Sequence, residues 1–182
     1  SNHRFNHMML KTNSSRKNIA STSLSVGINV GELKELLLFV IPKYSSDLDL
    51  IKMTEVHRGR LTSSKSISKN EFDHILLVLT SFITCPSTIV PSDIVAKVYT
   101  HIGLIREQQL RYGYAIEAFS TALWVQASDK SCLPLSVALT QHRLGQVYGK
   151  KGNHRQATAL LQKALDGYKQ ARVKEHQPVV IH

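Results

Sequence analysis

The sequence contains few of the residues that build disulfide-rich or membrane-spanning proteins. Only two of its 182 residues are cysteines, Cys85 and Cys132, and they form neither a CxxC motif nor a disulfide framework. Such sparse cysteine usage is typical of a reducing compartment. The longest apolar runs are Leu36–Ile41 and Ile75–Leu79 with its continuation to Ile83, far short of the roughly 20 residues that a membrane-spanning helix needs. We therefore expect a cytoplasmic protein with no transmembrane segment.

Acidic side chains are also scarce, and the imbalance makes the chain strongly basic. Thirteen aspartates and glutamates stand against 23 lysines and arginines, which leaves a formal net charge of +10 and a pI of about 9.8. A basic balance permits binding to nucleic acid, anionic lipid or acidic peptides, and it selects none of them. With 42% hydrophobic and 20% charged residues, the chain is otherwise ordinary for one globular domain, or for one domain with a tail.

Residues 1–31 have the composition of a disordered basic tail. They are rich in Ser, Thr and Asn, and they contain no acidic residue before Glu32. So little apolar surface cannot offset the entropy that is lost when a chain becomes ordered. An organellar transit peptide has a similar composition and is the alternative interpretation of this segment.

Residues 32–69 predict short helices followed by a polar linker. The segment Glu32–Ile41 is apolar, and Pro42 should end its helix because proline lacks the backbone N–H that a helix needs. Asp47–His57 is amphipathic, with an apolar face predicted from Leu48, Ile51, and Val56 or Met53. The stretch Arg58–Asn70 is rich in Ser and Lys and predicts a solvated linker.

From Asn70 onward the pattern becomes that of longer helices. Asn70 is a good N-cap residue, and a helix is predicted from there to Cys85 and Pro86. Its apolar face consists of Phe72, Ile75, Leu76, Leu79, Phe82 and Ile83. A new helix is predicted from Pro91 onward, and its partner covers Tyr114–Gln126.

The stretch Arg143–Gly167 has the spacing of a helix–turn–helix unit. The residues at the characteristic positions of this unit are Leu144, Gly145, Tyr148, Gly152, Ala157, Leu161 and Ala164, with Gly152 at the turn. An earlier copy lies 42 residues upstream, as the numbering of the pair Gly103 and Gly145 shows. Its matching residues are Ile102, Gly103, Ala115, Phe119 and Ala122. One fixed offset at five positions is hard to obtain by chance, so the sequence predicts an internal repeat.

The order of these residues resembles that of a tetratricopeptide repeat. Pro134, Val137 and Ala138 also resemble the segment that joins repeats in proteins of the kinesin-light-chain type. The residues His176–Val179 are similar to a further junction of this kind. The likeness covers about residues 92–180, and it is specific for architecture rather than for function.

The first repeat departs from the family pattern at two places. Arg106 stands where the second repeat has the aromatic Tyr148, and Leu110 stands where it has the turn glycine Gly152. We therefore expect the first turn to be displaced by a residue or two.

The resemblance implies an all-α solenoid of helix–turn–helix repeats over residues 70–182. The two repeats would cover about residues 92–133 and 134–175, with the helix of residues 70–84 packed against the N-terminal end. No polar capping helix follows the second repeat, so we expect a longer array or a partner at that end.

In this family the first helices of successive pairs line a concave surface where peptides bind. On the matching positions, the groove would present Lys97, Thr100, His101, Leu104 and Gln108 from the first repeat. The second repeat would add Leu139, His142, Arg143, Gln146 and Lys150.

The residues predicted to bind the peptide are Lys97, His101, His142, Arg143, Gln146 and Lys150. The basic and titratable groups among them suit an acidic peptide or one with a C-terminal carboxylate, to which Arg143 can donate two parallel hydrogen bonds. The alternative is that these residues are solvated helix positions of a basic protein.

No pattern for catalysis, metal binding or a cofactor emerges from the sequence. His101 and His142 could approach one another, but no third ligand lies at a useful spacing. Lys150–Gly152 lacks the glycines, the strand and the Ser or Thr of a phosphate-binding loop. We therefore predict no enzyme, no cofactor and no small-molecule substrate.

The function predicted from the sequence is a scaffold that binds a protein or peptide partner, acidic in character. One alternative is a helical repeat that binds nucleic acid through the net charge of +10. A repeat that reads RNA needs paired base-reading side chains, and Thr100 and His142, at equivalent positions, do not form such a code. The other alternative is a regulatory piece of a longer protein.

Overall fold

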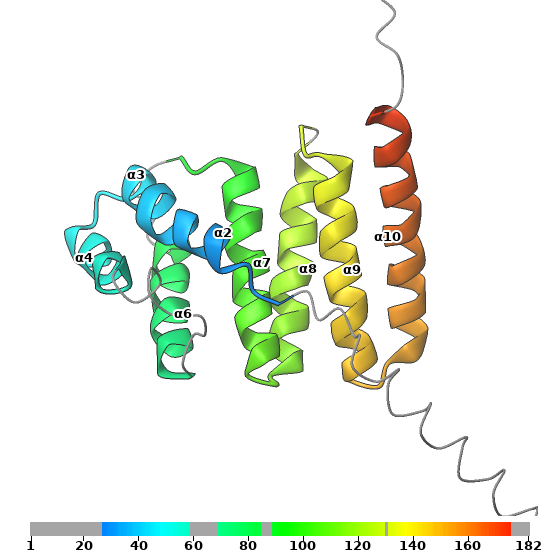
Figure 1. Cartoon of the computed structure of the whole chain (residues 1–182), viewed down its shortest axis with the longest axis horizontal. Coiled ribbons are helices and arrows are strands. Elements are labelled where there is room, and N and C mark those ends of the chain that lie inside the picture. Colours follow the sequence, from blue (N-terminus) through cyan, green and yellow to red (C-terminus); the bar gives the residue numbers. More distant parts are fainter. Residues whose placement is uncertain (1–26, 59–68, 85–88, 130, 176–182) are drawn as a thin grey trace, which may run out of the picture.

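The structure is a computed structural model, and it describes residues 27–58, 69–84, 89–129 and 131–175. Within these ranges every regular element is a helix, which confirms the all-α class (Figure 1). In chain order they are α2 (Val30–Glu35), η1 (Leu36–Val40), α3 (Ile41–Tyr44), α4 (Leu48–Val56), α6 (Lys69–Thr84), α7 (Ser92–Gln108), α8 (Tyr112–Ser128), α9 (Pro134–Lys150) and α10 (His154–Glu175). Residues 1–26 of the predicted tail, most of the predicted linker and the predicted junction His176–Val179 lie outside the described residues. The prediction that the tail extends to residue 31 is wrong, because Asn29 caps α2 and Ile28 and Val30 pack against the core.

The four helices α7 to α10 form two antiparallel hairpins that stand side by side. Each helix of this group packs against the next along the chain, and α6 packs against α7. Figure 1 shows these five helices in a row, with α2, α3 and α4 at the end of the row beside α6 and α7. The helix hairpins are those that the sequence pattern predicts.

The two hairpins have the same hydrogen bonds, displaced by 42 residues. At the first turn the N–H of Arg111 donates to the Arg106 carbonyl, and at the second the N–H of Asn153 donates to the Tyr148 carbonyl, both at 2.9 Å. The bonds of the neighbouring residues repeat in the same way. The internal repeat is therefore present in the backbone as well as in the sequence.

The first turn is not displaced, and the expectation that it would be is wrong. Leu110 has φ 59°, and Gly152, its equivalent, has φ 88°. Both residues thus adopt the left-handed conformation that ends a helix, which costs a residue with a Cβ more than it costs glycine. The backbone keeps the repeat geometry here although the sequence lacks the residue best suited to it.

The sequence predicted that the N-terminal helical segment ends at Pro42. This prediction is wrong, because the helical segment continues past the proline. The chain passes from α2 through the π-helical turn η1 into α3, where Pro42 occupies the first turn. At that position proline is tolerated because its missing N–H falls among the groups that a new helix leaves unpaired. The wider turn of η1, in which the N–H of Ile41 donates to the Leu36 carbonyl, shifts the hydrogen-bond register just before the proline.

The apolar face of α4 differs from the predicted one. Leu50, Thr54 and His57 are buried, whereas Leu48 and Val56 are exposed. Apolar residues lie on several sides of this short helix, so periodicity alone could not select the face that packs. The predicted start at Asn70 is also wrong by a residue, since α6 begins at Lys69, but the apolar face of α6 is largely the expected one.

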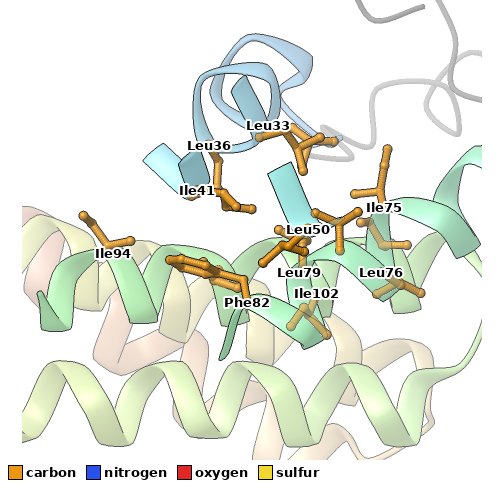
Figure 2. Packing of buried hydrophobic residues seen from close by; sticks show 14 of the residues in the cluster. Leu33, Leu36, Ile41, Leu50, Ile75, Leu76, Leu79, Phe82, Ile94 and Ile102 are labelled. Atoms are coloured by element: carbon orange, nitrogen blue, oxygen red, sulfur yellow. The ribbon is translucent and has the colours of Figure 1, made fainter. Parts of the chain in front are cut away.

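One hydrophobic cluster joins the N-terminal segment to the helices of the first hairpin. Figure 2 shows Leu33, Leu36 and Ile41 facing residues of α6 and α7. The cluster also contains Leu37, Leu50, Ile75, Leu76, Val78, Leu79, Phe82, Ile94, Val98, Ile102, Ile105 and Ala118. Ile28 packs against this cluster and against a second one between the hairpins, built around Phe119 and Leu144. The segment before the hairpins is thus part of the same core.

Within each hairpin a glycine brings the two helices close together. A Cβ on Gly103 would lie 2.8 Å from the Phe119 ring, and one on Gly145 would lie 3.0 Å from Leu161. Phe119 is fully buried, but Leu161 at the equivalent position is 39% exposed. The difference arises because α9 covers α8, whereas no described helix covers the outer face of α10. Of the other repeat positions, Ile102, Ala115, Ala122, Leu144, Ala157 and Ala164 are buried, and Tyr148 is half-buried.

Candidate functional site

A cavity of about 440 Å³ lies where the N-terminal segment meets the two hairpins. Its walls come from α2 and η1, from the first halves of α7 and α9, and from the last turn of α8. The apolar lining consists of Leu36, Val40, Ile94, Leu133, Leu135 and Leu139. The polar lining consists of Glu32, Glu35, Lys97, Thr100, His101, Gln126, Ser136, Thr140 and Arg143. Its volume is typical of pockets that hold small ligands or single side chains.

His101 is a buried residue that lines this cavity, and only one of its two ring nitrogens has a hydrogen-bond partner among the described residues. Its Nδ1 is 2.9 Å from the carbonyl oxygen of Lys97, one turn earlier in α7. Because a carbonyl only accepts, Nδ1 must carry the hydrogen, and Nε2 of the neutral ring has a lone pair. The side chain is 6% exposed, and Nε2 has no hydrogen-bond partner among the described residues.

Burial lowers the pKa of His101 below its ordinary value of 6.5. The hydrogen bond to Lys97 and the carboxylate of Glu32 oppose this shift, and the positive charges of Arg143 and Lys97 add to it. The ring is therefore neutral at pH 7. Its Nε2 faces the Glu32 carboxylate, whose Oε2 is 4.0 Å away.

Arg143 supplies the charged donor of the cavity from the middle of α9. The residue is half-buried, and its Nη1 is buried without a hydrogen-bond partner among the residues that the structure describes. Burial lowers the pKa of the guanidinium, and the carboxylates of Glu32 and Glu107 act against this. A guanidinium stays charged under such conditions, so Arg143 brings a positive charge to the cavity.

Gln126 contributes a third polar atom at the C-terminal end of α8. Its amide nitrogen donates to the hydroxyls of Ser136 at 2.9 Å and Thr140 at 3.2 Å. These two bonds fix the orientation of the amide. Its Oε1 is buried and has no partner among the described atoms.

Three of the six residues predicted to bind a peptide line this cavity, and three do not. Lys97, His101 and Arg143 come together there. His142 instead forms a 3.2 Å hydrogen bond to the Tyr168 hydroxyl on α10. The ammonium of Lys150 lies 2.6 Å from a carboxylate oxygen of Glu107, in an ion pair between α7 and α9. Gln146 is half-buried outside the cavity lining.

Of the other positions that the resemblance placed in the groove, some line the cavity and some do not. Thr100 and Leu139 line the cavity. Leu104 is buried in the cluster between the hairpins, and Gln108 is exposed near the turn.

The acidic residues and the glutamine of this cavity are not among the site residues predicted from the sequence. Glu32 and Glu35 lie in a segment before the repeats, where no spacing relates them to α7 or α9. Gln126 had a detectable signal, since it follows Phe119 and Ala122 on the buried stripe of α8. A polar residue on a buried stripe needs a hydrogen-bond partner, so its position in the sequence indicates a polar contact inside the fold. The cavity consequently holds charges of both signs rather than basic groups alone.

Comparison of the chain with protein-family models, with curated proteins and with solved structures finds no match. Its interpretation therefore rests on the residues of the cavity. In the described part of the chain no three His, Cys, Asp or Glu side chains are grouped so that they could hold a metal ion. None of the described helices is both long and apolar enough to cross a membrane.

Proposed function

We propose that this protein is a non-catalytic interaction module of the tetratricopeptide type that binds a peptide segment between α7 and α9. The observation that carries the proposal is the cavity that α7 and α9 form with the N-terminal segment. It brings together Lys97, His101 and Arg143, three of the positions expected to bind a peptide, beside the apolar residues Leu36, Leu135 and Leu139. Concave sites that combine an apolar lining with a few polar groups are the usual sites of ligand binding.

A peptide suits this cavity because its main chain carries both donors and acceptors, and the polar residues that line the cavity also include both. The apolar walls then provide room for a side chain. Leu36, Leu135 and Leu139 stand on opposite sides of the cavity, from η1 and α9.

An acidic residue in the peptide would add charge complementarity. Lys97 is exposed at the cavity and Arg143 is half-buried, so both can pair with a carboxylate. Charged pairs of this kind increase the association rate and fix the register of the ligand.

Binding without turnover fits the state of the cavity hydroxyls. Ser136 and Thr140 both accept hydrogen bonds from the amide nitrogen of Gln126. An amide cannot take up a proton as a general base does, so neither hydroxyl is activated as a nucleophile by this contact.

The proposal is tested by selecting a library of random peptides against the full chain. Wild-type protein and the Lys151→Gln variant, which changes an exposed lysine outside the cavity, should enrich the same peptides. Arg143→Gln and Lys97→Gln should bind them about tenfold more weakly. Lys97 is solvent-exposed, so its variant tests the site even if the Arg143 variant is unstable.

Circular dichroism spectra of all variants serve as the control for folding. Absence of enrichment over an unrelated protein would contradict the proposal. Tight binding of single-stranded RNA that weakens steeply with salt, together with no peptide binding, would show that the basic helices bind nucleic acid instead.

A further inference from the structure

The two residues at which the first repeat departs from the second lie on one surface. Arg106 stands where the second repeat has Tyr148, and Leu110 stands where it has Gly152. Both come together at Tyr114, near the start of α8. The guanidinium carbon of Arg106 lies 5.4 Å from the centre of the Tyr114 ring, and Leu110 and Tyr114 line one surface depression. Two departures from the repeat pattern therefore change the same part of the molecule.

Leu110 does not serve the packing of the fold. Its φ is 59° and its side chain is 71% exposed, whereas the equivalent turn has glycine, which adopts a left-handed backbone without strain. Backbone strain of this kind is concentrated at functional surfaces, where function keeps a residue that the fold disfavours. The side chain of Leu110 is thus available for contact with a partner.

Basic and aromatic side chains surround Leu110. Arg111 and Tyr112 line the depression from the start of α8, and Lys151 lines it from the turn between α9 and α10. Arg111 and Lys151 are exposed, and Tyr112 is half-buried. We define the turn patch as the following residues: Arg106, Leu110, Arg111, Tyr112, Tyr114 and Lys151.

The turn patch and the chain next to it are positively charged. Residues 106–117 and 150–155, which form the two turns and their flanks, contain five lysines and arginines and two glutamates. One of these glutamates, Glu107, is paired with Lys150 at 2.6 Å. The other, Glu117, lies in the depression with Arg111 and Lys151. The excess of positive charge attracts an anionic partner.

The turn patch lies at one end of the molecule. Figure 1 shows the turn after α7 and the turn after α9 at the same, lower end of the row of helices. The cavity residues of α7, from Ile94 to His101, lie in the first half of that helix, away from its turn. A broad, flat partner can therefore contact both turns and leave the cavity open.

We propose that the turn patch docks this protein on an anionic membrane surface. Leu110 enters the boundary between the lipid headgroups and the acyl chains, Tyr112 and Tyr114 lie at the level of the headgroups, and the basic residues pair with lipid phosphates. Only one aliphatic side chain of the patch enters the membrane, so the binding is weak and reversible. The site is separate from the cavity, and the inference does not depend on the proposed peptide binding.

The exposed leucine favours a membrane over nucleic acid as the partner. A single strand is held through its phosphates and through bases that stack on aromatic rings. An aliphatic side chain at the tip of a turn adds little to such a complex, and Arg106 already lies over the Tyr114 ring. A lipid surface, in contrast, interacts favourably with apolar, aromatic and basic groups at once.

The test measures co-sedimentation of the full chain with lipid vesicles. One set of vesicles is phosphatidylcholine alone, and the other contains about 30% phosphatidylserine, which makes the surface negative. We expect at least about fivefold more protein on the anionic vesicles, and less as the salt concentration is raised. Equal sedimentation with both sets, or with neither, would overturn the inference. Binding of single-stranded RNA without binding to vesicles would overturn it in favour of nucleic acid.

A variant that keeps the fold separates the role of the leucine from stability. Leu110→Gly removes both the side chain and the backbone strain, so the protein stays folded while its binding to anionic vesicles should fall about fivefold. Leu48→Gly removes a leucine that is 70% exposed at the start of α4; it is the matched control and should bind like wild type. Unchanged binding in Leu110→Gly would refute the role of the turn patch.

A pair of double variants tests the charged groups. Arg111→Gln combined with Lys151→Gln should bind anionic vesicles about tenfold more weakly. Lys52→Gln combined with Lys163→Gln removes the same charge from exposed positions on α4 and α10 and should have little effect. An equal loss in both double variants would show attraction by net charge alone and would contradict docking through the turns.

Discussion

Leu110 is the residue whose conformation conflicts most clearly with its type. It holds a φ of 59° at the turn between α7 and α8, and its side chain is 71% exposed, so packing does not compensate for the backbone conformation. The N–H of Leu110 donates to the Glu107 carbonyl and the N–H of Arg111 donates to the Arg106 carbonyl, and these two bonds close the end of α7 with Leu110 in this conformation.

Replacing Leu110 by glycine should therefore stabilise the protein. The left-handed conformation costs a residue with a Cβ roughly 1–2 kcal/mol, and glycine removes this cost. Glycine also increases the conformational entropy of the unfolded chain, which cancels part of the gain in stability. We expect Leu110→Gly to raise the free energy of unfolding by about 0.5–1 kcal/mol in urea denaturation. Gly152→Ala, at the equivalent turn, should lower it by about the same amount, and a loss of stability in Leu110→Gly would contradict the assigned turn.

At the scale of elements, the spacing of two helices in a hairpin is set by single glycines. Gly103 lets α7 approach α8 until the Phe119 ring occupies the space in which a Cβ would lie. Gly113 differs, because it lies in the first turn of α8 and a Cβ there would meet nothing within 4 Å. The two glycines have the same secondary structure and opposite surroundings.

The substitution of alanine at these two positions should have opposite effects. Gly103→Ala forces the Phe119 ring or the helix to move, and overpacking of this kind costs about 1–3 kcal/mol. Gly113→Ala should stabilise by about 0.5–1 kcal/mol, because alanine is the better helix former at an exposed position. Thermal unfolding of the two variants checks the expectation, and equal shifts in Tm would show that the α7–α8 contact is looser than described.

The helices of the repeat could be predicted from sequence because their signals are periodic and local. The N-cap region of α7, the buried stripe of α8 and the turn at Gly152 all depend on residues within a few positions of one another. The π-turn before Pro42 and the packed face of α4 could not be predicted. Both are decided by contacts with α6 and α7, far along the chain.

The candidate site divides in the same manner. Lys97, His101 and Arg143 follow from the repeat, since equivalent positions on α7 and α9 face one surface. His142 and Lys150 were assigned to that surface too, and they turn instead toward Tyr168 and Glu107. Helical periodicity predicted which face of α7 and α9 points toward the cavity. The packing of the neighbouring helices determined which side chains near the edge of that face line the cavity and which bond to other helices.

For the whole molecule, folding is coupled to the protonation of His101. The ring is buried in the folded chain and exposed in the unfolded one, so the environment that lowers its pKa exists only in the folded chain. The charged groups that face it are Glu32, Lys97 and Arg143. In the unfolded chain the same ring returns to its ordinary pKa of 6.5.

Stability should therefore decrease in mild acid. The pKa of His101 is lower in the folded chain than in the unfolded one, so its contribution is fully present above pH 6.5 and is lost as the pH falls through the folded-state pKa. Urea titrations between pH 7.5 and 5 should show a steeper loss for wild type than for His101→Gln. The comparison also removes the contribution of the other histidines, and identical slopes would contradict the burial of His101.

The cavity has walls of two kinds, and they differ in how easily evolution can alter them. Its floor belongs to the repeated hairpins, where His101 and Gln126 are buried and most substitutions would be costly. Glu32 and Glu35 are exposed on a short helix outside the repeats, and changing them costs little stability. Under the proposed function, neutral substitutions in α2 would change the ligand preference of the cavity while the hairpins keep their structure.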